Sequence, residues 1–179
     1  MEAMRKKEFF VISRDEPVCP ICGNPLRLRD HKKRIWRKDG GDTQWVAIGR
    51  YRCTNNECHR LHNALPDFLL PFKHYDRELV EDVIEGIVYE DDPWRDAAYP
   101  CESTMQRWRK WAAENAAAME GQIRSAGMRF LDLKDEFLKS AESLLEELKR
   151  KISPGWLAAV VKIVYNSGGS LRPVYDDGS

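Results

Sequence analysis

The sequence predicts an α+β protein in which an N-terminal β-hairpin module precedes an all-α bundle. Three observations lead to this fold class. Two close cysteine pairs bracket residues 23–52, a stretch with strand composition. Inside that stretch, Asp39-Gly40 stands between two extended arms, which is a strong hairpin signal. From residue 76 onward, apolar residues recur at the three- and four-residue spacing of amphipathic helices.

Length and composition bound the class of protein. A chain of 179 residues with 42% hydrophobic content can bury one core or two small ones. The longest apolar run is interrupted by Lys162 and is shorter than the ~20 residues of a membrane span. Five cysteines without a signal peptide indicate a reducing compartment, where close cysteine pairs bind metal more often than they form disulfides. We therefore expect a cytoplasmic protein.

The cysteine pairs predict a structural zinc site, because two tight turns can each supply one edge of a tetrahedron. Gly23 can take the positive φ that the first turn needs. Four thiolates would fill the coordination shell and leave no position for a catalytic water. We expect His59 and His62 to contact the site or the surface rather than to bind the metal. The candidate ligands are Cys19, Cys22, Cys53 and Cys58.

The hairpin arms are strongly basic. Residues 8–13 have strand composition and are expected to add an edge strand to the hairpin. The arms carry Arg27, Arg29, Lys32, Lys33, Arg34, Arg37, Lys38, Arg50 and Arg52 against Asp30, Asp39 and Asp42. This one-signed excess, interleaved with Trp36, Trp45 and Tyr51, favours a surface that faces a polyanion, with Arg34, Arg37 and Lys38 as candidate contacts. The alternative is the solvated face of a small sheet.

A connector and a first helix follow the hairpin. Pro66 and Pro71 argue against a helix over residues 64–75 and predict an extended connector. A helix over residues 76–88, capped by Asp76, would have one apolar face and one acidic face. The acidic face, which carries Glu78, Glu81, Asp82 and Glu85, is expected to point away from nucleic acid.

The segment 76–120 predicts a helix-turn-helix. Asp92-Pro93 can open a short helix that ends before Pro100, and Ser103 with Gln106 forms a capping-box pattern for the next helix. In a helix-turn-helix the last helix lies in the major groove with its N-terminal residues against base edges. The candidate contacts are Ser103, Gln106, Arg107 and Lys110. The alternative is an ordinary amphipathic helix in a bundle.

Two further helices complete the predicted bundle. One spans residues 128–152, and one follows Ser153-Pro154 and ends at residues 167–169. The last helix is apolar nearly all round, so it is either the centre of the bundle or a surface for self-association or a protein partner. The predicted parts are 1–63 (zinc ribbon), 64–75 (connector), 76–120 (helix-turn-helix), 121–168 (C-terminal helices) and 169–179 (flexible tail).

Known catalytic patterns are absent from the sequence. It holds no Gly-rich phosphate loop, no Ser-His-Asp arrangement and no dinucleotide fingerprint. Cys101 has no cysteine partner nearby and is expected to be a small packing residue. We therefore expect a protein that is not an enzyme, with a catalytic fragment of a larger assembly as a weaker alternative.

Several stretches carry a resemblance to a known family: CPICGNPL, RYRCTNNECHRLHNALPDFLLPFKHY, STMQRWRKW and GWLAAVVKIVYNSGG. Over roughly residues 17–170 the chain resembles an uncharacterised Firmicutes family, a domain of unknown function described as transposase-like for its zinc ribbon followed by a helix-turn-helix. The resemblance implies zinc on the four cysteines and DNA contact from residues 103–118. It supplies no reaction, since the family lacks the catalytic domain of true transposases. The chain departs from the family in the wider spacing of Cys53 and Cys58.

Together these patterns predict a DNA-binding protein with structural Zn2+, associated with a mobile element or regulatory, with double-stranded DNA as the expected ligand. The alternative is a zinc-ribbon adaptor for protein–protein interactions that docks a partner through its C-terminal helices.

Overall fold

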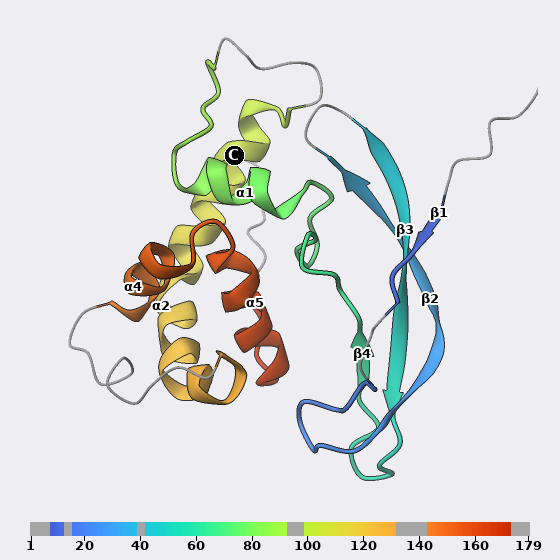
Figure 1. Ribbon diagram of the computed structural model, residues 1–179. Coiled ribbons are helices and arrows are strands. Elements are labelled where there is room, and N and C mark those ends of the chain that lie inside the picture. The colour runs from blue at the N-terminus through green and yellow to red at the C-terminus, as the bar shows by residue number, and fades with distance from the viewer. Residues whose placement is uncertain (1–7, 13–15, 39–41, 93–98, 132–142, 173–179) are drawn as a thin grey trace, which may run out of the picture. The chain divides into compact units, whose positions relative to one another are not determined.

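The computed structural model describes residues 8–12, 16–38, 42–92, 99–131 and 143–172, and these form an α+β fold (Figure 1). The α+β class of the prediction is confirmed. The chain divides into two compact units, one of residues 1–76 with 96–99 and one of residues 77–95 with 100–179. The first unit holds the sheet, and the second holds the described helices.

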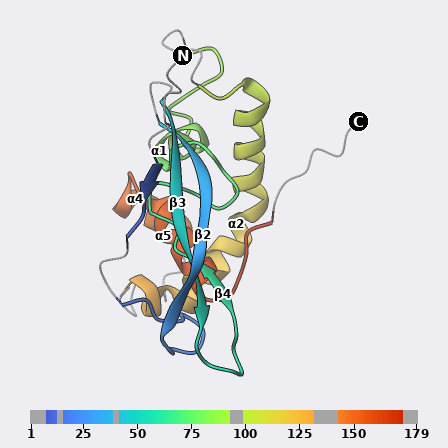
Figure 2. The same ribbon diagram turned by 90° about the vertical axis from the view of Figure 1, so that its right-hand side faces the viewer.

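A four-stranded sheet is built around one central strand. β3 (Thr43–Cys53) pairs antiparallel with β2 (Leu26–Arg37) along its whole length. On its other edge β3 pairs with β1 (Glu8–Phe10), which is parallel, and with β4 (Leu61–Asn63), which is antiparallel. Figure 2 shows β1, β3 and β2 side by side. The predicted hairpin and the predicted edge strand are therefore confirmed.

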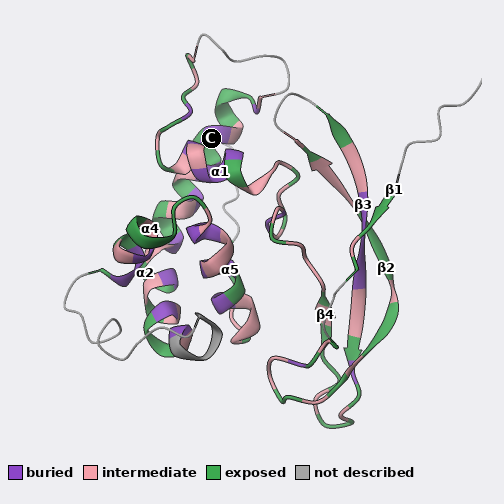
Figure 3. Cartoon of the chain, in the orientation of Figure 1, coloured by how far each residue is buried: buried purple, intermediate pink, exposed green. Residues whose placement is uncertain are grey.

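One face of the sheet is covered by the segment between β4 and the first helix. Val46 and Ile48 in the middle of β3 are each 1% exposed, and Leu69 and Leu70 of the segment are buried as well (Figure 3). Trp36 stacks on Phe68 with 4.1 Å between ring centroids. Residues 64–76 thus contribute to the core of the first unit, without a helix, as their prolines predict.

The second unit is a bundle of helices. Its described helices are α1 (Arg77–Ile84), α2 (Glu102–Leu131), α4 (Leu144–Ile152) and α5 (Trp156–Asn166). α2 contacts each of the other three. Among the described residues, no helix combines the length and apolar character needed to cross a membrane.

The apolar character of α5 is explained by burial within its own unit. Trp156, Leu157, Val160 and Val161 are between 0% and 9% exposed (Figure 3). The helix ends as predicted, with Ser167 at the C-cap and Gly168 at φ 87°. α5 is therefore the apolar centre of the second unit.

The structure corrects three helix predictions. α1 ends at Ile84 rather than at residue 88, since Gly86 adopts φ 71° and turns the chain. The single helix predicted over 128–152 is wrong, because Ser143 is extended and caps a new helix with its side chain. α2 begins at Glu102, so Ser103 lies inside its first turn instead of at the N-cap. The short helix predicted at Asp92-Pro93 falls largely on residues 93–98, outside the described residues.

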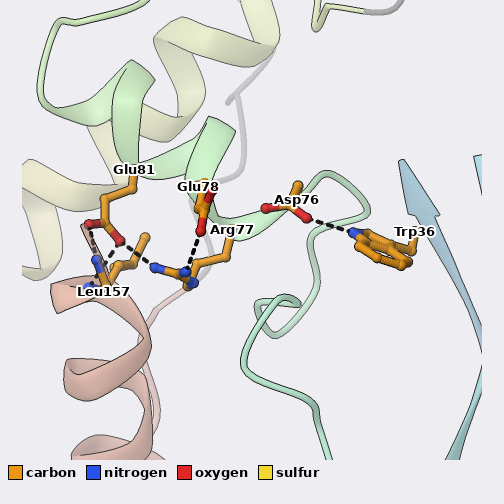
Figure 4. Close-up of polar contacts among 7 residues, drawn as sticks. Trp36, Asp76, Arg77, Glu78, Glu81 and Leu157 are labelled. Carbon is orange, nitrogen blue, oxygen red and sulfur yellow. Dashed lines mark hydrogen bonds and ion pairs between the residues drawn. The ribbon is translucent and has the colours of Figure 1, made fainter. Parts of the chain in front are cut away.

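Asp76 directly precedes Arg77, the first residue of α1, which is the position predicted for the cap. Its carboxylate accepts a hydrogen bond from Trp36 Nε1 at 2.9 Å, which ties the end of the segment to β2 within the first unit (Figure 4).

Glu81 lies in the interior of the second unit rather than on an exposed acidic face. It is 2% exposed, and its carboxylate accepts hydrogen bonds from the backbone N–H groups of Gly155 and Leu157 at the start of α5. Arg77 pairs with the same carboxylate at 3.1 Å, and its guanidinium also reaches Glu78 (Figure 4). A buried carboxylate is stable here because it meets helix N–H donors and a cation. The sequence analysis places Glu81 on the acidic face of this helix, and the structure buries it inside the second unit.

Glu81→Gln should lower the free energy of unfolding by about 1–3 kcal/mol, since the amide loses the charge that binds Arg77 and the N–H groups of α5. Urea denaturation followed by helical circular dichroism measures the change. Glu78→Gln is the matched control, because its exposed pair with the same Arg77 is worth at most about 1 kcal/mol. Equal effects from the two substitutions would contradict the capping role of Glu81.

Candidate metal centre

Four cysteine side chains converge at one end of the sheet. The sulfur atoms of Cys19, Cys22, Cys53 and Cys58 all lie within 4.8 Å of one another. Cys19 Sγ is 3.8 Å from Cys58 Sγ, and Cys22 Sγ is 3.4 Å from Cys53 Sγ. The predicted cysteine cluster is therefore present, and it can hold a metal ion.

The first cysteine pair is positioned by a tight loop before β2. The N–H of Cys19 donates to the Asn24 carbonyl, and the N–H of Gly23 donates to the Cys19 carbonyl, each at 2.8 Å. Gly23 closes this loop at φ 73°, a conformation that side chains disfavour and glycine accepts. The positive φ predicted at Gly23 is confirmed. The loop leaves Cys19 buried and Cys22 exposed.

The second pair is positioned by Asn55, which explains how its wider spacing is accommodated. The Asn55 carbonyl accepts the N–H groups of Cys58 and His59 at 3.1 and 3.0 Å. Its side-chain oxygen accepts the N–H of Glu57, which forms an Asx turn. The chain between Cys53 and Cys58 therefore coils back, so that four intervening residues place the two sulfurs together.

The donor set fits a tetrahedral zinc ion. A Zn–S bond of about 2.3 Å in a tetrahedron requires sulfurs about 3.8 Å apart. The Cys19–Cys58 and Cys22–Cys53 sulfur separations, 3.8 and 3.4 Å, lie close to that value. Four thiolates at this spacing repel one another unless a cation lies between them. The sulfurs therefore suit a soft divalent metal, without showing which one.

The thiols differ in how readily they ionise. A hydrogen bond from the Asn24 backbone lowers the pKa of Cys22 to about 6, whereas burial raises the pKa of Cys53 to about 12. The Cys22 thiol is therefore largely ionised at neutral pH. The Cys53 thiol loses its proton only when a cation compensates the buried charge.

The two histidines near the second pair occupy different places. His62 on β4 brings Nε2 to 3.3 Å from Cys19 Sγ, within hydrogen-bonding distance for sulfur, and burial lowers the pKa of this imidazole. His59 is exposed at φ 47° and is not part of the cluster. Sequence spacing alone does not tell which of the two histidines lies next to the cysteines. The pairing of β4 with β3 does, because it sets His62 opposite Tyr51.

The predicted nucleic-acid contacts on the hairpin have unequal surroundings. Arg34 is half-buried and donates to the carbonyls of Leu70 and Lys73 at 3.4 and 2.7 Å. Burial lowers the pKa of Arg34.

Arg37 is exposed, and its Nη1 donates to the Tyr75 hydroxyl. Lys38 extends over the Trp36 ring, 4.5 Å from its centroid. Arg34 therefore binds the chain itself, and Arg37 is the more accessible cation.

The other predicted contacts share the first turns of α2, in the second unit. Ser103, Gln106, Arg107 and Lys110 are all exposed there. Gln106 donates to the Glu102 side chain at 2.9 Å, and Lys110 lies 3.9 Å from Glu114. On the opposite side of the helix, Met105, Trp108 and Met119 are buried. The two groups of predicted contacts thus lie in separate compact units.

The first 90 residues from Cys19 onward match a known protein family. Residues 19–108, half of the chain, match the model of a family described as a domain of unknown function, DUF6431. The chain belongs to this family. The DUF6431 match begins at the first cysteine of the cluster and ends at Trp108, so it spans all four sulfurs, the hairpin, α1 and the first turns of α2. No similar protein was found among the curated proteins or the solved structures.

Cys101, also inside the DUF6431 match, departs from its prediction as a packing residue. It is exposed, and its carbonyl accepts the N–H groups of Thr104 and Met105 at the start of α2. Hydrogen bonds with the hydroxyls of Ser103 and Thr104 lower the pKa of Cys101 to about 7. The exposed thiol is therefore an ionisable group near neutral pH.

Alkylation of Cys101 by iodoacetamide should rise with pH around a midpoint of about 7, since the thiolate reacts. Peptide mapping by mass spectrometry follows Cys101 separately from the cluster. Ser103→Ala should move the midpoint upward, because one hydrogen bond to the thiolate is lost. A midpoint near the ordinary 9.0 in both proteins would contradict the hydroxyl contacts.

Proposed function

We propose that this chain is a DNA-binding protein whose sheet unit is held together by a structural zinc ion. The observation that carries the proposal is the convergence of four cysteine sulfurs within 4.8 Å at the end of a basic hairpin. Zinc bound there would add on the order of 10 kcal/mol to folding of this unit. A closed set of four thiolates favours a structural ion over a catalytic one.

The charge of the hairpin supports nucleic acid as the ligand. Exposed cations follow both strands: Arg27, Arg29, Lys32, Lys33, Arg37 and Arg52. Asp30, the acidic residue of β2, already binds Arg50 through both carboxylate oxygens. The acid therefore offsets a neighbouring arginine and leaves the exposed surface positive, which suits contact with phosphates.

The exposed start of α2 supports a second contact, with base edges. Gln106, Arg107 and Lys110 lie on its first three turns, on the side opposite the buried Met105 and Trp108. Arginine and lysine recognise guanine, and glutamine recognises adenine, in the major groove. We propose that α2 plays the part of a recognition helix, in a transposase-like protein that binds DNA and carries no catalytic domain of its own.

The alternative is an adaptor that docks a protein partner on α5. The burial of α5 argues against this docking surface. Trp156, Leu157 and Val160 are at most 1% exposed, so a partner could not reach them without opening the second unit.

Binding of the zinc-loaded protein to a labelled DNA duplex should weaken steeply with salt, with a log–log slope set by the number of phosphates neutralised. Fluorescence anisotropy at two salt concentrations measures that slope. Arg107→Ala with Lys110→Ala should weaken binding by about 5- to 100-fold and make the slope shallower. Removal of zinc by a chelator should abolish binding, because the ribbon loses its closure.

Arg150→Ala with Lys151→Ala is the matched control. It removes the same two charges from an exposed site at the end of α4, and it should leave the affinity within about twofold. A salt-independent affinity, or equal losses in both double variants, would contradict the proposed interface.

A further inference from the structure

The register of the sheet gathers aromatic and basic side chains on one face. Residues directly paired across two strands, and alternate residues along one strand, share a face. Phe10 and Lys33 both pair with Ala47, His31 pairs with Gly49, and Arg37 pairs with Thr43. We use the name "aromatic face" for the surface formed by Phe10, His31, Lys33, Arg37, Trp45 and Tyr51. The opposite face carries Trp36, Val46 and Ile48 against residues 64–76.

Small residues in β3 let aromatic rings lie on this face. Phe10 meets His31 edge-on across β3, with 5.6 Å between ring centroids, over the positions of Ala47 and Gly49. A Cβ atom at Gly49 would come within 2.6 Å of Tyr51 Cε2, so the Tyr51 ring lies directly over this glycine. Phe10 nevertheless remains 59% exposed.

The charge of the aromatic face is positive. Lys33 and Arg37 are both exposed, and Arg37 also lies over the Tyr75 ring at 5.1 Å. Among the described positions of β2, β3 and β4 on this face, none is acidic, and Glu8, the first residue of β1, pairs with Trp45 in the backbone register. Asp30 pairs with Arg50 and belongs to the opposite face.

The face combines cations with the exposed rings of Phe10 and His31 and the half-buried rings of Trp45 and Tyr51. This combination suits nucleic acid with unpaired bases. Bases stack on aromatic rings while lysine and arginine bind the phosphates between them. In a duplex the bases stack on each other, so only unpaired bases can reach such rings. An acidic peptide would use the cations and leave the rings without a matching group.

We propose that the aromatic face binds an unpaired segment of DNA by stacking bases on Trp45 and Phe10, with Lys33 and Arg37 on its phosphates. The inference rests on the proposed DNA binding and adds a second ligand, single-stranded DNA, at a defined surface. Tyr51 links this face to the metal centre, because it pairs in register with His62, which contacts Cys19. Zinc should therefore be needed for this binding too.

The test uses the full-length zinc-loaded protein and fluorescein-labelled oligothymidylate of about 12 nucleotides, a length within the range that single-strand-binding domains cover. Phe10→Ala and Trp45→Ala should each lower its affinity by about 5- to 100-fold. Trp45→Phe keeps a ring and should retain most of the binding. Phe10 is largely exposed, so its substitution leaves the core intact and keeps the test valid if Trp45→Ala misfolds.

Phe72→Ala is the matched control, since Phe72 is 81% exposed on the segment after β4, outside the aromatic face. It should leave oligothymidylate binding unchanged, and both aromatic-face variants should leave duplex binding within about twofold. Duplex binding without oligothymidylate binding, or equal losses from Phe10→Ala and Phe72→Ala, would overturn this inference and leave the proposed function standing. Binding of neither DNA would overturn both. Displacement of oligothymidylate by polyglutamate at equal charge concentration would assign the face to acidic peptides and overturn the inference.

Discussion

The first unit depends on the convergence of two loops that are far apart in the sequence. The loop before β2 and the loop after β3 bring four sulfurs within 4.8 Å, at the end of the hairpin opposite its turn. A long hairpin with a small buried core is marginally stable in water. The described apolar core of this unit comes chiefly from the middle of β3 and from Leu69 and Leu70. A metal ion held by the four sulfurs would supply stability that a small core cannot.

The second unit is held together differently, by buried apolar helix faces with carboxylates and amides at the helix ends. Glu81 caps α5, and Glu120 on α2 accepts the N–H groups of Leu144 and Leu145 at the start of α4. Asn115, also on α2, is 2% exposed and holds the backbone of Arg172 through its side-chain amide. The contacts of Glu81 and Glu120 fix where α5 and α4 begin, whereas apolar packing alone would tolerate sliding.

The hairpin, the cysteine cluster and the last helix could be predicted from the sequence because their signals are local. Asp39-Gly40 between strands, cysteines at metal-ligand spacing and Ser167-Gly168 after an apolar run each indicate one structure. The buried role of Glu81 could not be predicted, since its partners Gly155 and Leu157 are more than seventy residues away. The helix boundary at Ser143 was missed because apolar residues continue at helical spacing on both sides of it.

The same distinction applies to the surface. Composition shows that the hairpin is basic, but the bulge between Leu28 and Asp30 decides which residues share a face. A count of cations could not show that Arg34 binds backbone carbonyls of its own chain whereas Arg37 is exposed. The aromatic face appears only when β1 and β2 are placed in register on β3. Family membership agrees with this organisation, since the DUF6431 match starts at Cys19 and spans the four cysteines with β2, β3 and β4.

We propose that the four cysteines bind one metal ion and that His62 lies beside it without ligating it. X-ray absorption spectroscopy of the purified protein at the zinc edge measures the ligands of this ion. We expect four sulfur neighbours at about 2.3 Å and no imidazole scattering. Protein without bound metal, or a shell of three sulfurs and one nitrogen, would contradict it.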